Sequence, residues 1–343
     1  MSGTSRRSRL VDELLASPEP SIRWRVRVGV LGESRDEPRV ERLERGVRAS
    51  VRVRALLSGV AEGPSSEALR HPYSKWKGAH WVLAALADLG YPPGDPVLEP
   101  VRDRVLDLWL GGYYRRAIVA KSGSRATSPA GIPVIRGRAR SHASQQGNAL
   151  RYLTVLGLVD ERVAELVQLL LRWQWPDGGW NCDRRPGAET SSFMETLLPM
   201  RGLATYAEAA GDRPAAASAC RATELFLQRH LFRRKSNGRP IRPDFLELHY
   251  PLYWHYDILG GLRGVGDVGR LEDPRASEAL DWLEARELPD GGWAADARYY
   301  QVGRTARTGA ESVDWGRGDS RRRNDWVTTE ALWVLRAAER LSI

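Results

Sequence analysis

Ionisable side chains gather at the starts of several predicted helices, where they are suited to acid–base chemistry. Carboxylates beside histidines are common general acids and bases, provided that they reach the ligand. Predicted helices at 141–158, 190–210, 249–265 and 324–340 all carry such groups near their first turns. We predict a catalytic set from these positions, with His249 as a further partner: Glu195, Asp257, Asp325, Glu330, His142 and His255.

Aromatic and amide side chains occupy the same helix starts, together with the start of a helix predicted at 74–90. Such residues converging on a cavity are typical of a small-molecule site. The predicted ligand-binding set is Trp76, His80, Gln146, Phe193, Tyr253, Trp254 and Trp326. The alternative for each ring is plain packing in the core.

A zinc site is a further hypothesis. Cys182 and Asp183 are adjacent, and His249 begins a neighbouring predicted helix. Cysteine, aspartate and histidine are ordinary zinc ligands, and zinc would lower the pKa of the thiol. The alternative is a buried or idle thiol.

The net charge of +9 is concentrated in three loops. Loop 111–140 has seven basic residues and no acidic ones, while loops 231–248 and 294–323 each carry an excess of three positive charges. If these loops lie beside helix N-termini, the combined field suits an anion. The predicted anion-binding residues are Arg115, Arg116, Arg136, Arg138, Arg234 and Arg322. Solvated surface loops are the alternative.

The elements that must position these residues are helices. Aspartates, several of them followed by proline, precede amphipathic runs, as expected for helix N-caps. An N-terminal hairpin at 1–35 and repeats beginning near 36, 95, 160, 212 and 273 give six hairpins in one domain, residues 1–343. The predicted helices are 9–16, 20–32, 37–58, 74–90, 97–110, 141–158, 161–174, 190–210, 214–230, 249–265, 274–287 and 324–340. The expected fold is all-α.

One short phrase occurs twice, 113 residues apart. Pro-Asp-Gly-Gly-Trp stands at 176–180 and 289–293, and each copy follows a predicted helix. Pro, Asp and Gly favour a tight turn, and the tryptophan is expected to pack on the preceding helix. With Gln174, the first copy resembles the QW repeat of squalene/terpene cyclases and protein prenyltransferase β-subunits.

That resemblance implies an (α/α)6 toroid with a central cavity and an isoprenoid or similar apolar ligand carrying a diphosphate-like head. The chain has neither the Asp-x-Asp-Asp nor the Asp-Asp-x-x-Asp motif of those enzymes, so the reaction is left open. The alternative is a non-catalytic helical-repeat protein that binds nucleic acid or another anionic partner. Two cysteines and no membrane-length apolar run favour a cytoplasmic protein.

Overall fold

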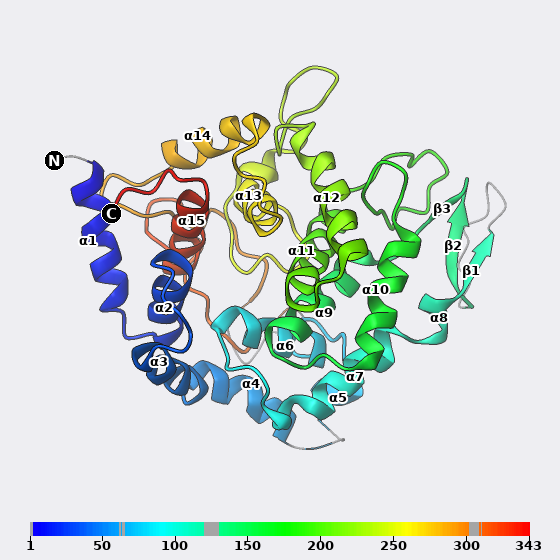
Figure 1. Ribbon diagram of the computed structural model, residues 1–343, viewed down its shortest axis with the longest axis horizontal. Coiled ribbons are helices and arrows are strands. Elements are labelled where there is room, and N and C mark those ends of the chain that lie inside the picture. The colour runs from blue at the N-terminus through cyan, green and yellow to red at the C-terminus, as the bar shows by residue number, and fades with distance from the viewer. Residues whose placement is uncertain (1–2, 62, 64–65, 120–129, 302–308, 310) are drawn as a thin grey trace.

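The computed structural model describes residues 3–61, 63, 66–119, 130–301, 309 and 311–343. The fold is predominantly helical, with a small sheet at one edge (Figure 1). No described helix has the length and apolar character needed to cross a membrane. The α-helices are α1 (Gly3–Leu15), α2 (Pro20–Trp24), α3 (Pro38–Arg48), α4 (Val51–Ala61), α5 (Glu67–Arg70), α6 (Ala79–Leu89), α7 (Glu99–Trp109), α8 (Gly112–Arg115), α9 (Ala143–Val155), α10 (Glu161–Trp173), α11 (Phe193–Ala210), α12 (Arg213–Leu227), α13 (Ile258–Asp267), α14 (Ser277–Ala285) and α15 (Asp325–Ala337).

Short helices of other types complete the helical part. A π-helix, η1 (Arg25–Val30), continues α2, and three 3₁₀ turns are η3 (Pro96–Leu98), η4 (Pro243–Leu246) and η5 (Pro274–Ala276). Four of the predicted helices differ clearly from the structure, and the first of them, 9–16, already begins at Gly3. Helix 37–58 is divided at Ala49–Ser50, and helix 74–90 begins only at Ala79. Helix 249–265 begins at Ile258, because Pro251 lacks the N–H that a helix interior requires.

The sheet lies within residues 111–140, which the sequence predicts to be a loop. Strands β1 (Ala117–Val119), β2 (Ile132–Ile135) and β3 (Arg138–Ala139) lie in the order β1-β2-β3. β1 runs parallel to β2, and β2 pairs antiparallel with β3. Ile132 and Ile135 are buried, so the β-branched residues of this loop pack as strand residues usually do.

Aspartate caps confirm most of the predicted helix starts. The side chains of Asp95, Asp160, Asp212 and Asp273 each accept a hydrogen bond from a backbone N–H two or three residues ahead. Each thereby satisfies a donor that has no partner inside the helix. The exception is near residue 36, where Glu37 occupies the cap position without a side-chain bond.

The two Pro-Asp-Gly-Gly-Trp turns have the same structure. Trp180 and Trp293 are both fully buried, and their indole N–H groups donate to Leu170 O at 3.0 Å and Leu283 O at 2.7 Å. Both rings therefore pack on the helix that precedes them, α10 or α14, as predicted. In both turns the backbone N–H of the tryptophan also donates a hydrogen bond to a threonine hydroxyl of a following helix. The acceptor is Thr196 of α11 in the first copy and Thr328 of α15 in the second.

The residue six positions before each tryptophan anchors its turn to a further helix, α12 for the first copy and α1 for the second. Gln174 exchanges hydrogen bonds with Ser218 of α12, where its amide nitrogen donates to the backbone oxygen and its Oε1 accepts from the hydroxyl. Glu287 takes this position in the second copy and accepts two hydrogen bonds from Arg7 of α1, at 2.8 and 3.0 Å. A residue of α1 thus anchors the second turn, as a residue of α12 anchors the first. Accordingly, both chain ends lie on the same side of the molecule (Figure 1).

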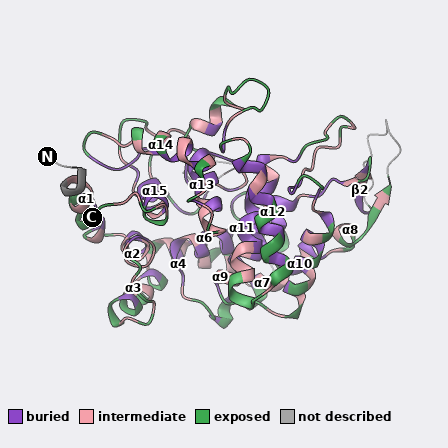
Figure 2. Ribbon diagram, turned by 45° about the horizontal axis from the view of Figure 1, so that its top comes forward, coloured by how far each residue is buried: buried purple, intermediate pink, exposed green. Residues whose placement is uncertain are grey.

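Six helical elements contact one another in succession around the middle of the molecule: α6–α9, α9–α11, α11–α13, α13–α15 and α15–η1. The series returns to its start because Arg25 of η1 donates to Asp88 O of α6 at 2.9 Å. Buried residues are concentrated in these elements, as α11 and α13 illustrate, whereas peripheral α3 is largely exposed (Figure 2).

Helices α9 and α11 touch through their backbones. A Cβ placed on Gly202 would stand 2.2 Å from Gly147 O, and one on Gly147 would stand 2.3 Å from Pro199 Cα. Only glycine allows so close an approach of two chains. The contact fixes the spacing between the two helices that carry Arg151 and Arg201.

Candidate functional site: an arginine-lined central cavity

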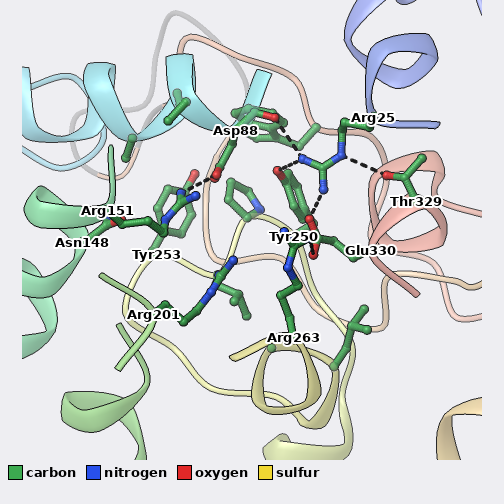
Figure 3. A pocket seen from close by; sticks show the side chains of 18 of the residues that line it. Arg25, Asp88, Asn148, Arg151, Arg201, Tyr250, Tyr253, Arg263, Thr329 and Glu330 are labelled. Atoms are coloured by element: carbon green, nitrogen blue, oxygen red, sulfur yellow. Dashed lines mark hydrogen bonds and ion pairs between the residues drawn. The ribbon is translucent and has the colours of Figure 1, made fainter. Parts of the chain in front are cut away.

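A cavity of about 300 Å³ lies between the six inner elements. Each of them contributes one charged residue to its lining: Arg25 (η1), Asp88 (α6), Arg151 (α9), Arg201 (α11), Arg263 (α13) and Glu330 (α15). In Figure 3 the four arginines extend toward the same space from different elements. The volume is at the lower end of the range for ligand sites, which is about 300–1,000 Å³.

Ion pairs join most of these side chains into one network. Glu330 accepts from Arg25 and, at 3.0 Å, from Nη1 of Arg263. Asp267, one turn beyond Arg263, accepts from Nε of Arg263 at 2.9 Å and from Nε of Arg201 at 2.6 Å. The network therefore links η1, α15, α13 and α11.

Arg151 forms a separate pair with Asp88, whose Oδ1 lies 2.5 Å from Nη2. The Nε of Arg151 is buried and has no hydrogen-bond partner among the described residues. The Nη1 and Nη2 groups of Arg201 likewise have none within that part of the chain, since Arg201 is held through Nε alone. Arg25, in contrast, uses all three of its nitrogens, on Thr329, Asp88 O, Tyr250 and Glu330. Spare donors are thus concentrated on α9 and α11.

The electrostatics show an excess of positive charge around α13. The pKa of Arg263 is lowered to about 10, mainly by burial and also by the charges of Arg201 and Arg25, against the opposing effect of Asp267. Burial disfavours the charged form of Asp267, but Arg201 and Arg263 outweigh it and hold the pKa of this carboxyl below its usual range. An additional anion in the cavity would offset the repulsion among these arginines.

A buried histidine–aspartate pair forms another part of the lining. Nδ1 of His249 lies 3.0 Å from Oδ2 of Asp257, and Asp257 also caps α13 by accepting from Gly260 N at 2.7 Å. Burial opposes the imidazolium, but Asp257 prevails and raises the pKa of His249. Nε2 of His249 is buried and has no partner among the described residues. The ring is therefore held from one side and retains one unused nitrogen.

Glu311 is a second group suited to proton transfer. It lines the cavity, is 9 % exposed, and accepts a hydrogen bond from the Tyr253 hydroxyl at 2.8 Å. Burial raises the pKa of this carboxyl to about 7, although the hydrogen bonds from Tyr253, Val313 and Ser312 act in the opposite direction. A carboxyl that titrates near neutral pH can both take up and release a proton under physiological conditions.

Aromatic rings form much of the remaining wall. Tyr253 stacks on Trp76, with ring centroids 3.6 Å apart, and Trp81 packs edge-on against both. Elsewhere in the lining, Tyr250 contacts Trp315. These rings give the cavity apolar surfaces between its charged groups.

The structure brings two of the predicted catalytic carboxylates, Asp257 and Glu330, to this cavity. Glu195 lies outside its lining and accepts from Ser144 N at 2.8 Å, and Asp325 pairs with Arg323 in a separate surface groove. His142 is the residue before α9 and is not part of the lining. His255 stacks on Tyr299 outside it, and burial followed by the charge of His249 lowers the pKa of His255 to about 4.

Of the predicted ligand-binding residues, only Tyr253 lines the cavity. His80 is fully buried, accepts from Trp109 and Tyr152 through Nδ1, and has its pKa lowered to about 3 by burial. Gln146 donates to Trp109 O, and Phe193 packs among Phe226, Phe245 and Tyr256. The rings of Trp76, Trp254 and Trp326 pack against other aromatic residues.

None of the six loop arginines lines the cavity. Arg115 pairs with Glu165, Arg136 with Glu189, and Arg322 lies 3.7 Å from Asp319. Arg234 donates to backbone oxygens, Arg138 lies over Trp175, and Arg116 is exposed. Lys121, Arg125, Arg304 and Arg307 of the basic loops lie outside the described residues.

The predicted zinc ligands are not brought together. Within the described part of the chain, no three His, Cys, Asp or Glu side chains form a group that could hold a metal ion. Asp183 pairs with Arg185, and His249 with Asp257. Burial, followed by the charge of Glu195, raises the pKa of Cys182 well above its ordinary value.

Sequence reasoning missed Arg25, Asp88, Arg151, Arg201, Arg263 and Glu311 as cavity residues. Four of these, Asp88, Arg151, Arg201 and Arg263, carry a usable signal, because each stands in a largely apolar stretch, as in Leu-Ala-Ala-Leu-Ala-Asp and Leu-Leu-Pro-Met-Arg-Gly. Arg25 does not, since Arg23 and Arg27 lie on either side of it. Charged residues inside apolar helices are rarely buried unless they are paired. Glu311 has no such signal, since it lies in an irregular segment. No protein-family model matches this chain, and neither does any curated protein.

Proposed function

We propose that this protein binds a small organic anion in the central cavity, with the charged head against the arginines and a compact apolar body against the aromatic wall. The observation that carries the proposal is the pair of unused Nη groups on Arg201, a residue that lines the same cavity as Arg151. Guanidinium donors left free beside a cavity are suited to carboxylate and phosphate oxygens.

The architecture supports a relationship with the terpene cyclase and prenyltransferase toroids as part of this proposal. The closed series of inner contacts and the two equivalent tryptophan turns are both expected of such a ring. By analogy, isoprenoid-like compounds with an anionic head are one ligand class to test. The small volume favours short members of that class.

Proton transfer is the reaction type that the lining supports best. The His249–Asp257 pair has the arrangement of an oriented acid–base group, and Glu311 supplies a second titratable group. Among the predicted catalytic residues, we retain Asp257 and Glu330 in the proposed site. Glu330 there acts on the ligand through the arginines that it holds.

The loop arginines do not favour the nucleic-acid alternative. Arg115 and Arg136 already pair with glutamates, and Arg234 with backbone oxygens. Such engaged side chains offer less free charge to a phosphate backbone than the composition alone suggests.

Native mass spectrometry of the purified protein, followed by titration with organic acids, tests the proposal. Trp24, Trp81, Trp315 and Trp333 line the cavity, so binding should change tryptophan emission. Arg201→Gln should weaken binding at least about ten-fold, as expected for a hydrogen bond to a charged group. The matched control Arg136→Gln, at an exposed arginine, should leave the affinity unchanged. Equal affinities for both variants and the wild type would remove the site from the proposal.

A further inference from the structure

Around the cavity, the arginines outnumber by one the carboxylates that accept hydrogen bonds from them. Four arginines (Arg25, Arg151, Arg201, Arg263) are hydrogen-bonded to three carboxylates (Asp88, Asp267, Glu330). His249 and Asp257 balance each other when the imidazole is protonated, which its raised pKa favours. Glu311 adds little negative charge below pH 7, because its pKa is raised to about 7 by burial.

Unused donors are found on Arg201, whose Nη1 and Nη2 groups have no hydrogen-bond partner among the described residues. Arg151 and Arg201 come from helices whose backbones touch at Gly147 and Gly202, so their guanidinium groups approach the cavity from adjacent elements. Burial disfavours the charged form of Arg151, but Asp88, and next Asp267, raise its pKa. Both arginines line the same cavity.

We infer that the head group bound between Arg151 and Arg201 is a carboxylate or another monoanion, and not a phosphate ester or a diphosphate. This inference rests on the proposed function and specifies its ligand. A monoanion matches the one uncompensated charge, whereas each further negative charge would enter an enclosed site without a partner, which is costly. The two unused Nη groups of Arg201 also lie in one plane, so they can donate two parallel hydrogen bonds to the two oxygens of a carboxylate.

Matched ligands with one apolar body and different heads give a direct test. Benzoate and benzenesulfonate carry one negative charge, phenyl phosphate carries more, and benzamide carries none. A second series compares geranate with geranyl diphosphate. At pH 6, where Glu311 is mostly neutral, and at constant ionic strength, we expect the monoanions to bind at least about ten-fold more tightly than their phosphate counterparts and benzamide. Equal or tighter binding of the phosphates overturns the inference but leaves the proposed function standing. If no member of either series binds, both fail.

Two variants separate charge from geometry. Arg201→Lys keeps the charge but loses the fork, so benzoate binding should weaken about ten-fold, and Arg151→Lys provides the same test if the first variant does not fold. Asp88→Asn raises the excess charge from one to two and should shift the preference toward phenyl phosphate. Arg136→Gln is the control, and far-ultraviolet circular dichroism checks the fold. An unchanged preference in Asp88→Asn, or unchanged benzoate affinity in Arg201→Lys and Arg151→Lys, would contradict the assignment.

Discussion

The hydroxyl of Tyr253 donates a hydrogen bond to Oε2 of Glu311 across 2.8 Å, inside a cavity whose other acidic groups are paired with arginine or histidine. Glu311 therefore accepts this hydrogen bond from a neutral hydroxyl. Asp88 and Glu330 instead accept from arginines, and Asp257 lies beside a histidine. Its pKa, raised by burial to about 7, reflects that difference. The proton on this carboxyl should affect both stability and ligand affinity.

Glu311 should make folding pH-dependent. Its folded-state pKa of about 7 lies above the ordinary value of 4.5, so between these values the folded protein binds the proton more tightly than the unfolded chain. The contribution is fully present below pH 4.5 and is lost as the pH rises to 7. Urea unfolding at pH 5 and pH 8 should show a loss of roughly 2–3 kcal/mol in the wild type relative to Glu311→Gln. Parallel pH profiles for the two proteins would contradict the assignment.

The same proton should tune anion binding. When Glu311 is neutral, the full excess of positive charge is available, so benzoate should bind more tightly at pH 6 than at pH 8. Tyr253 and Tyr300, the titratable groups that interact with Glu311, stay neutral in this range because burial raises the pKa of each well above it. Fluorescence titration of Glu311→Gln should show a smaller pH dependence than the wild type. A dependence of undiminished size would assign the effect to another group.

Truncation of either turn tryptophan should be strongly destabilising. Trp180→Ala or Trp293→Ala empties a fully buried site and removes a hydrogen bond to the preceding helix. We expect a loss of about 3–5 kcal/mol in the free energy of unfolding, measured by urea denaturation. Trp282→Ala, at a half-buried tryptophan of α14, is the matched control and should cost less. Similar losses of unfolding free energy for all three variants would show that the buried turn tryptophans contribute no more to stability than Trp282 does.

Glycines at two helix positions should respond to alanine in opposite directions. Gly202→Ala places a methyl group 2.2 Å from Gly147 O and should cost about 1–3 kcal/mol or more, because the backbones must separate. Gly59 in α4 has open space around its Cβ position, so Gly59→Ala should stabilise by about 0.5–1 kcal/mol through helix propensity. Thermal unfolding midpoints that move in the same direction for both variants would contradict the close packing of α9 and α11.

Glu330→Gln should destabilise the fold, because it removes the charge that holds Arg25 and Arg263. Hydrogen bonds to charged groups contribute about 1.5–3 kcal/mol each, and glutamine retains part of this. We expect about 2 kcal/mol in urea unfolding. The exposed pair of Arg136 and Glu189 supplies the control, since Glu189→Gln should change stability by no more than about 1 kcal/mol. Equal effects would indicate that the network is solvent-screened.

Local signals in the sequence predicted the helices and the tryptophan turns well. Asp160 and Asp212 cap helices as expected, because an N-cap depends on residues two or three positions away. The helix prediction failed at 249–257. Pro251 and the contact between His249 and Asp257 give this segment an irregular conformation.

The anion-binding residues were harder to predict, because composition does not reveal pairing. The sequence alone does not show that Arg136 and Arg201 differ in their environment. The first lies on the surface beside Glu189, while the second is buried and keeps two nitrogens unused. Whether an arginine has spare donors depends on which acids the fold places beside it, and Asp267 reaches Arg201 from another helix.

The two equivalent turns differ in how early they can form. Gln174 meets Ser218 across 44 residues of chain, so α10 and α12 can associate while much of the chain is still unfolded. Glu287 meets Arg7 across 280 residues, and closing so long a loop delays the contact. During synthesis Arg7 of α1 must therefore wait for its partner until Glu287 is made. The junction of α1 with α14 should close last during folding, and native-state hydrogen exchange should find it among the first regions to open.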